Sequence, residues 1–228
     1  MRTITVFIIW LCVFLPACAT ATGSGPVSGQ DTTDALKQAL TQGADAAVDK
    51  LGVADGFLNN PKVKIPLPGS LQKVEGIMRT LGMSKYADGL IVTMNHAAEA
   101  AAAEAKPLLM DAVQKMSVED ASTILASGDD AATQYFRKTT SEALSQKFLP
   151  IVKNATDQVG LIKKYNEFAG KGAKLGLIGE KDANIENYVT QKTLDGLYLM
   201  MAEEERAIRS DPMGQGSKLI QRVFGPLK

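Results

Sequence analysis

The chain offers few residues for nucleophilic or acid–base catalysis, and its only imidazole is that of His96. A serine-type triad would need His96 as its base, with a serine and a carboxylate from elsewhere in the chain. No Gly-x-Ser-x-Gly sequence is present to expose such a serine. Ser70-Leu71-Gln72-Lys73 fits the Ser-x-x-Lys pattern of some acyl-enzyme hydrolases, but the supporting Lys-Thr-Gly and Ser-Asp-Asn sequences are missing. We therefore predict no catalytic residues, with His96 on an exposed helix face and Ser70 as a helix cap. The sequence Ser117-Val118-Glu119-Asp120 predicts a second cap, with acidic residues placed on the helix dipole.

A metal site would have to rely on oxygen ligands, because the chain has one His and two Cys. Asp129 and Asp130, with Asp111 or Glu119, could surround a hard cation. Adjacent acidic residues after Gly128 also suit the start of a helix, where carboxylates complement the helix dipole. We predict this capping role and no metal or other cofactor, which leaves Asp129 and Asp130 as the metal candidates that the sequence offers.

Two polar segments could bind a partner protein or a small ligand. Three prolines between positions 61 and 68 forbid a helix there and predict an extended, ordered loop that presents polar side chains rigidly. The predicted helix after position 128 carries polar residues at three- and four-residue spacing. A loop that covers the core and a solvated helix face would explain the same patterns. The candidate binding residues are Asp130, Gln134, Arg137, Asn60 and Lys64.

Helices must position these residues, because apolar side chains recur at three- and four-residue spacing along most of the chain. The run Leu36, Leu40, Ala44 and Val48 is one example, and no alternating strand pattern exceeds the segment 62–65. We predict an all-α protein, a single multi-helix bundle of about eight helices with an extended Pro-rich loop. Near its C-terminal end, Glu205 and Arg209 lie four residues apart, which predicts a surface ion pair.

Composition excludes several classes of protein. The 228 residues suit one domain of ordinary size, and 45% apolar with 22% charged residues indicates a folded chain. Twenty-five basic residues balance twenty-five acidic ones, so the chain lacks the basic excess typical of a nucleic-acid-binding protein.

The N-terminus has the features of an export signal. Arg2 precedes an apolar run from Ile4 to Leu15, which is shorter than a membrane-spanning helix and typical of a signal peptide. Leu15-Pro16-Ala17-Cys18 follows and resembles the lipobox of bacterial lipoproteins. That resemblance implies cleavage before Cys18 and a diacylglycerol on its sulfur. The alternative is ordinary signal-peptidase cleavage after Ala19 or Ala21, which would give a soluble periplasmic protein.

The predicted organisation is a lipoprotein signal peptide over 1–17, a flexible tether over 18–33 and a helical domain over 34–228. Cys12 lies in the segment to be removed, so acylation would account for the single remaining thiol. The membrane is then a partner through the N-terminal lipid. Ala19 rather than Asp after the lipidated Cys18 favours the outer membrane, by analogy with other lipoproteins.

Several stretches of the chain form distinctive strings. They are Asn59-Asn60-Pro61-x-Val63-Lys64-Ile65-Pro66-Leu67-Pro68, the segments 128–137, 139–144, 148–153, 188–192 and 194–197, Ala202-Glu203-Glu204-Glu205 and Gly216-Ser217. Together they resemble the bacterial domain-of-unknown-function 4197 family, over roughly Leu36 to Phe224. The resemblance implies an exported helical protein. It transfers no functional residues, because the family carries no established activity.

These observations favour a lipid-anchored cell-envelope protein whose non-catalytic helical domain binds a partner protein or a small ligand. The alternative is a periplasmic hydrolase that depends on carboxylates or on a divalent metal at Asp129 and Asp130. A third hypothesis is a carrier of apolar ligands, with an internal cavity lined by some of the nine methionines. A deep pocket with two perturbed carboxylates would favour the hydrolase, whereas a shallow surface would favour the binding domain.

Overall fold

The computed structural model describes residues 28–82, 84–157, 160, 162–163, 165–166, 170, 174, 184–214 and 217–225. Within these residues the chain forms eight helices and no strand, which confirms the predicted all-α fold. The helices are α1 (Gly29–Leu51), α2 (Gly69–Thr80), α3 (Ser84–Ala103), α4 (Lys106–Lys115), α5 (Val118–Ala126), α6 (Ala131–Thr156), α8 (Ile185–Ser210) and α9 (Lys218–Phe224). None of the helices described is long and apolar enough to cross a membrane. The predicted signal peptide and Cys18 lie outside the described residues.

Helix α1 begins earlier than the sequence predicted. The tether was expected to extend to residue 33, but α1 begins at Gly29. Ser28 and Asp31 form a capping box, in which the Asp31 N–H donates to the Ser28 hydroxyl (3.0 Å) and the Ser28 N–H donates to the Asp31 carboxylate (3.2 Å). These bonds, first from the backbone and then from the side chain of Ser28, hold the pKa of Asp31 below its ordinary value. Residues 29–33, whose polar composition predicted a tether, therefore form the first residues of α1.

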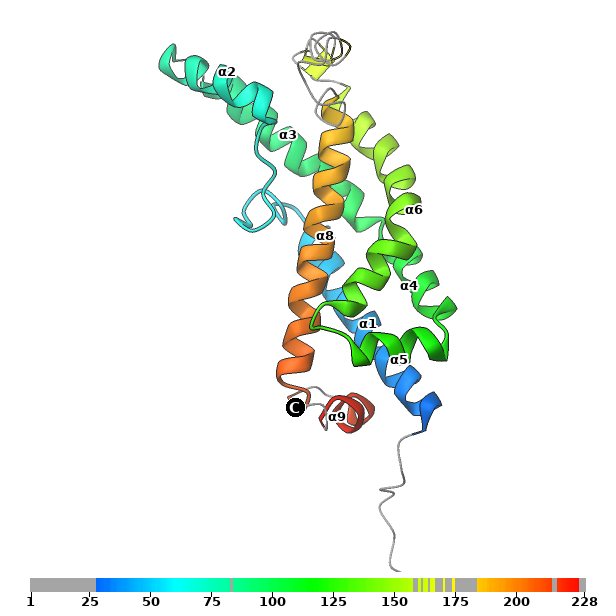
Figure 1. The fold of residues 1–228 in the computed structure, drawn as a ribbon. Helices are drawn as coiled ribbons and strands as arrows, with labels where there is room; N and C mark the ends of the chain where they lie inside the picture. Colours follow the sequence, from blue (N-terminus) through cyan, green and yellow to red (C-terminus); the bar gives the residue numbers. More distant parts are fainter. Residues whose placement is uncertain are drawn as a thin grey trace, which may run out of the picture.

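The helices form one elongated bundle around α8 (Figure 1). Helix α8 packs against α1, α3 and α6, and α6 also packs against α3 and α4. Helices α5 and α9 lie beside α1 at one end of the bundle. At the other end, α2 and the first turns of α3 project as a helical hairpin (Figure 1).

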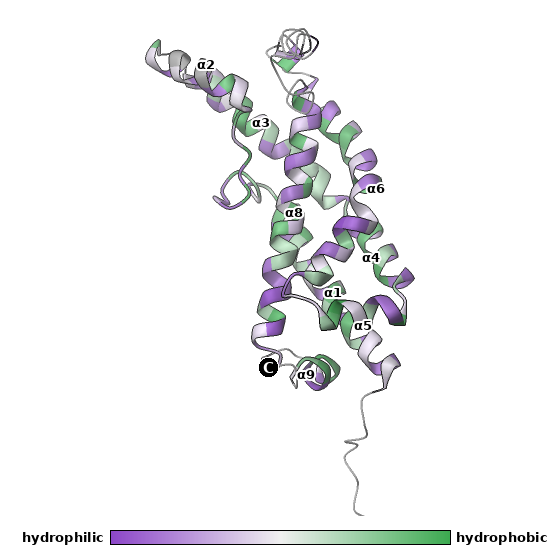
Figure 2. Cartoon of the chain, in the orientation of Figure 1, coloured by the Kyte–Doolittle hydropathy of each residue, from purple (hydrophilic) through white to green (hydrophobic). Residues whose placement is uncertain are grey.

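The core lies where α1, α3, α6 and α8 meet. Hydrophobic residues recur along these helices in Figure 2, and the largest fully buried side chains include Tyr198, Phe57, Phe136 and Phe148. One close approach depends on a glycine, since a Cβ atom at Gly196 would lie only 2.7 Å from Cε1 of Phe57. The segment after α1 therefore packs directly onto the backbone of α8.

The Pro-rich segment is an extended loop, as predicted, and it covers the core. Its alternate residues Val63, Ile65 and Leu67 are buried. The side chain of Asn95 in α3 binds Ile65 twice, accepting its N–H (2.8 Å) and donating to its carbonyl (2.9 Å). The Tyr188 hydroxyl donates to the carbonyl of Pro66 (3.1 Å). The loop is thus held to both α3 and α8 through its backbone.

Two predicted helix caps have different outcomes. Ser117 caps α5 as predicted, because the Asp120 N–H donates to its hydroxyl (3.1 Å) and the Asp120 carboxylate accepts the Ser117 N–H (3.0 Å). Ser70 lies inside α2 rather than at its cap, so that prediction is wrong. The carbonyl of Pro68 accepts the first backbone hydrogen bonds of α2, and the Ser70 hydroxyl lies 2.7 Å from that of Tyr165.

Candidate functional site

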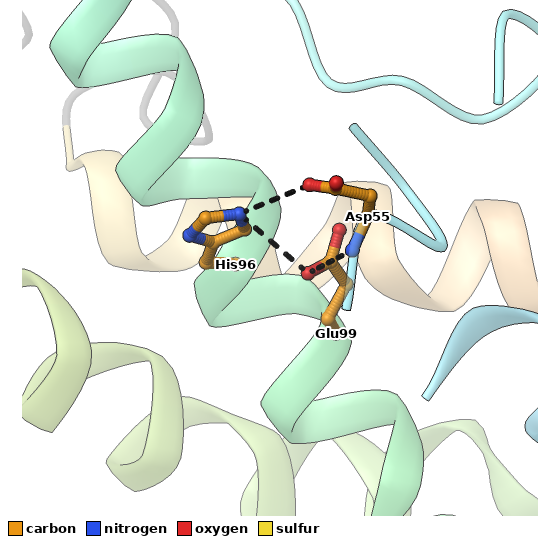
Figure 3. A group of neighbouring side chains, drawn as sticks. All are labelled: Asp55, His96 and Glu99. Atoms are coloured by element: carbon orange, nitrogen blue, oxygen red, sulfur yellow. Dashed lines mark hydrogen bonds and ion pairs between the residues drawn. The ribbon is translucent and has the colours of Figure 1, made fainter. Parts of the chain in front are cut away.

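Three side chains that can bind a cation meet beside the turn that follows α1, and we call them the Asp55–His96–Glu99 cluster (Figure 3). His96 and Glu99 lie three residues apart on α3, so they project from the same side of that helix. Asp55 comes from the turn, which passes close to α3, since a Cβ atom at Gly52 would lie 2.8 Å from the Cα atom of Ala103. Among the residues that the structure describes, no other three metal-binding side chains lie so close together.

Glu99 is the fixed member of the cluster. Its side chain is 7% exposed and accepts backbone N–H groups from Phe57 and Leu58 at Oε1 and from Asp55 at Oε2, each at 3.1 Å. Three donors offset the cost of burying a carboxylate and orient both of its oxygens. Asp55 has a left-handed backbone, with a φ of 63°, which an aspartate tolerates better than most residues. Glu99 therefore holds the turn against α3.

His96 and Asp55 are the solvent-facing members, with side chains 52% and 49% exposed. Nε2 of His96 lies 3.4 Å from Oδ1 of Asp55 and 4.0 Å from Oε2 of Glu99. A protonated imidazole would pair with these carboxylates, whereas a neutral one offers a nitrogen lone pair to a cation. The predicted exposure of His96 is confirmed, but sequence reasoning missed its carboxylate neighbours. The available signal was the His96-x-x-Glu99 spacing on one helix face.

A distant carboxylate caps α6, rather than Asp129 or Asp130. Asp130 directly precedes the helix, but its side chain makes no capping bond. Instead, the Glu205 carboxylate of α8 accepts the backbone N–H groups of Ala132 (3.0 Å) and Thr133 (2.9 Å). The predicted position of these acids at a helix start is confirmed, since Asp130 is the N-cap residue of α6, but a capping hydrogen bond is missing because the Asp130 backbone lacks the extended conformation of a usual N-cap. Both aspartates are exposed, and in the described part of the chain no metal-ligating group of three includes them.

The predicted Glu205–Arg209 ion pair is confirmed, but its predicted surface position is wrong, because both side chains are nearly buried. The two side chains are 10% and 13% exposed, and Nη2 of Arg209 lies 2.9 Å from Oε1 of Glu205. Arg209 also donates to the carbonyl of Ile124 (3.3 Å). A cavity of about 20 Å³ lies beside the pair, lined mostly by apolar side chains such as Phe136 and Phe224. Its volume has room for about one water molecule.

The candidate residues of α6 lie on its polar side. The guanidinium carbon of Arg137 lies 4.6 Å from the ring centre of Tyr198, and its Nη1 lies 3.4 Å from Oδ1 of Asp195. The Gln134 amide donates to the Asp130 carboxylate (3.2 Å). Arg137 and Gln134 therefore contact other side chains of the protein, as residues on a half-exposed helix face commonly do.

The candidate residues of the Pro-rich loop lie elsewhere. Asn60 accepts the backbone N–H of Lys62 (3.1 Å), and its amide nitrogen lies 3.8 Å from the sulfur of Met200. Lys64 is exposed. The loop and α6 lie on opposite sides of α8 (Figure 1). The five predicted binding residues therefore do not form one pocket.

A larger polar hollow, of about 820 Å³, lies where α6 ends and α8 begins. Its described lining includes two cations, Lys153 and Lys163, and two acids, Asp157 and Glu186. The amide of Asn166 donates to both oxygens of Glu186 (2.7 and 3.1 Å). The balanced charges of this lining select neither an anion nor a cation.

Comparison with known proteins gives one match, to a family. Residues 26–225 match the family model DUF4197, which is described as a protein of unknown function. No curated protein and no solved structure matches the chain. The matched segment includes the eight helices that the structure describes.

Proposed function

The chain belongs to the DUF4197 family, and we propose that it is a lipid-anchored cell-envelope protein whose helical domain acts by binding rather than by catalysis. The bound species is a partner protein or a small ligand. The lipid on Cys18 would hold the domain at the periplasmic face of a membrane, with the outer membrane favoured.

The observation that carries the binding role is that the buried carboxylates are taken up by hydrogen bonds within the fold. Glu99 accepts three backbone N–H groups, and Glu205 accepts two and pairs with Arg209. Glu186 accepts two bonds from Asn166. Backbone N–H groups fix Glu99 and Glu205 in place, and the Asn166 amide binds both oxygens of Glu186, so these carboxylates are not free to move toward a substrate as a general acid or base would. This arrangement supports a binding domain over a carboxylate hydrolase.

The size of the cavity in the core supports a ligand bound at the surface. The cavity beside Glu205 is about 20 Å³, whereas a small-molecule pocket commonly has several hundred. An apolar ligand carried inside the bundle would need a far larger space. A partner protein or a polar ligand at the surface fits the domain better.

Substitution of Cys18 tests the anchor. We expect Cys18→Ser to abolish labelling by radioactive palmitate and to release the protein from the membrane fraction. Cys12→Ser is the matched control, because Cys12 lies in the segment that cleavage would remove, and both readouts should stay unchanged. Persistent labelling of the Cys18→Ser chain would refute lipidation at this residue.

Crosslinking in the native envelope tests the binding role. We expect discrete crosslinked species that form with the wild-type chain and decline with Cys18→Ser, because release from the membrane separates the domain from its partner. The purified chain should not turn over ester substrates. EDTA-sensitive turnover by that chain would instead establish the hydrolase alternative.

A further inference from the structure

We propose that the Asp55–His96–Glu99 cluster binds one divalent transition-metal cation of the Zn²⁺ type. The proposal deepens the binding function, on which it rests, by naming a class of ligand, and it is independent of the lipid anchor. The cluster offers one imidazole nitrogen and two carboxylate oxygens from two separate segments of the chain.

The separations of the ligand atoms suit such a cation. A tetrahedral ion held about 2.1 Å from each ligand atom places those atoms about 3.4 Å apart. Nε2 of His96 and Oδ1 of Asp55 lie 3.4 Å apart, and Nε2 and Oε2 of Glu99 lie 4.0 Å apart. All three ligand atoms lie within 4.8 Å of one another. Asp55 and His96 are half-exposed, so rotation of their side chains can close the remaining gap.

Glu99 provides a ligand that is oriented before the cation arrives. Its Oε2 accepts one hydrogen bond, from the N–H of Asp55. A carboxylate oxygen has two lone pairs, so one remains for a cation. The N–H groups of Phe57 and Leu58 fix the other oxygen. Hydrogen bonds to a ligating carboxylate are what orient it in known metal sites.

The ligand set selects the class of cation. Ca²⁺ and Mg²⁺ prefer six or more oxygen ligands, whereas an imidazole with carboxylates suits Zn²⁺ and its transition-metal neighbours. Two carboxylates balance the charge of a divalent ion. The solvent-facing positions of Asp55 and His96 leave the outer side of the ion open to water, as in three-ligand zinc sites.

A competing explanation is a plain ion pair between protonated His96 and Asp55, which would need no metal. Both explanations use the same 3.4 Å contact. They differ in one respect, since only the metal site gives saturable binding of Zn²⁺ with one equivalent per chain. Direct titration therefore separates them.

The test is calorimetric titration of the full-length chain with Zn²⁺ alone. The chain carries Cys12→Ser and Cys18→Ser, so that no thiol competes for the ion, and it carries no polyhistidine tag. It is solubilised in detergent, stripped with EDTA and dialysed. We expect one site per chain, at least tenfold weaker binding in His96→Ala and in Asp55→Asn, and weaker binding of Mg²⁺ than of Zn²⁺. Asp129→Asn is the matched control, because it removes the same charge from an exposed carboxylate outside the cluster, and its affinity should equal that of the parent chain.

Three results would overturn the proposal: no saturable Zn²⁺ binding, unchanged affinity in His96→Ala, or equal affinity for Mg²⁺. Loading with Co²⁺ gives a second readout, because visible absorption bands should appear in the parent chain and disappear in His96→Ala. Since His96 is the only imidazole, no other histidine can replace it. If one variant fails to fold, the other carries the test. Failed titration with crosslinking intact would remove the metal site and leave the proposed binding function.

Discussion

Replacing Glu205 by glutamine should destabilise the fold, because both oxygens of this carboxylate face donors. Oε1 accepts the N–H of Ala132 and binds Arg209, while Oε2 accepts the N–H of Thr133. In either orientation, glutamine would point its NH₂ group at a backbone N–H. Charge-assisted bonds contribute about 1.5–3 kcal/mol each. Removing one member of a buried ion pair costs about 3–5 kcal/mol.

We expect Glu205→Gln to lower the free energy of unfolding by about 3 kcal/mol, at the lower end of that range, because Arg209 keeps its bond to the Ile124 carbonyl and its side chain is 13% exposed to water. The assay is urea unfolding followed by far-UV circular dichroism, with a lower midpoint and an unchanged slope. Glu203→Gln is the matched control on α8, since it breaks a more exposed pair with Lys62. Glu203→Gln should lower the free energy of unfolding by less than about 1 kcal/mol.

A second substitution tests how much of the lost stability comes from the broken ion pair rather than from the lost helix cap. Adding Arg209→Met to Glu205→Gln removes the cation that the first change leaves unpaired. We expect the double variant to be destabilised by less than the sum of the two single variants, by about 1 kcal/mol or more. Equal costs for Glu205→Gln and Glu203→Gln would refute the structural role of Glu205 altogether.

Two further stability predictions concern a close contact and a cap. Gly196→Ala should lower the free energy of unfolding by about 1–3 kcal/mol, measured by thermal unfolding, because its Cβ would lie 2.7 Å from Cε1 of Phe57. Adding Phe57→Leu to this variant should recover part of the lost stability. If no stability is recovered, the strain does not come from the contact with Phe57. Ser117→Ala should cost about 1 kcal/mol at pH 7. Bonds from the backbone and hydroxyl of Ser117 lower the pKa of Asp120, so this stabilisation is present above the ordinary value of 3.8 and is lost as the pH falls below it. Ser117→Ala removes the bond from the Ser117 hydroxyl to the Asp120 carboxylate, so the difference in stability between the two chains should narrow in acid, and a constant difference would contradict that bond.

Sequence reasoning succeeded where the determining contacts are local. The apolar spacing along Leu36, Leu40 and Ala44 predicted a helix, and those residues are buried in α1. Proline geometry predicted the extended loop, and the spacing of Ser117 and Asp120 predicted a cap that the structure confirms. In each of these cases the interacting groups lie within a few residues of one another, so their relation can be read from the order of the chain.

The predictions failed where contacts join distant segments. The N–H groups at the start of α6 bind Glu205, which is 73 residues from Ala132. Asp55 lies 41 residues from His96, so neither residue alone indicated a shared cluster. The start of α1 is a different case, because the Ser28 and Asp31 spacing was visible in the sequence but the polar composition around it favoured a tether.

The hydrogen bonds between Glu99 and the turn after α1 also determine which positions tolerate substitution. Glu99 binds main-chain N–H groups, and every residue except proline supplies one. As far as this contact is concerned, positions 55 and 58 accept almost any side chain, whereas position 99 needs a carboxylate of this length. A single residue of α3 thus holds three main-chain groups of the turn at once, and a substitution scan would show position 99 to be less tolerant than position 58.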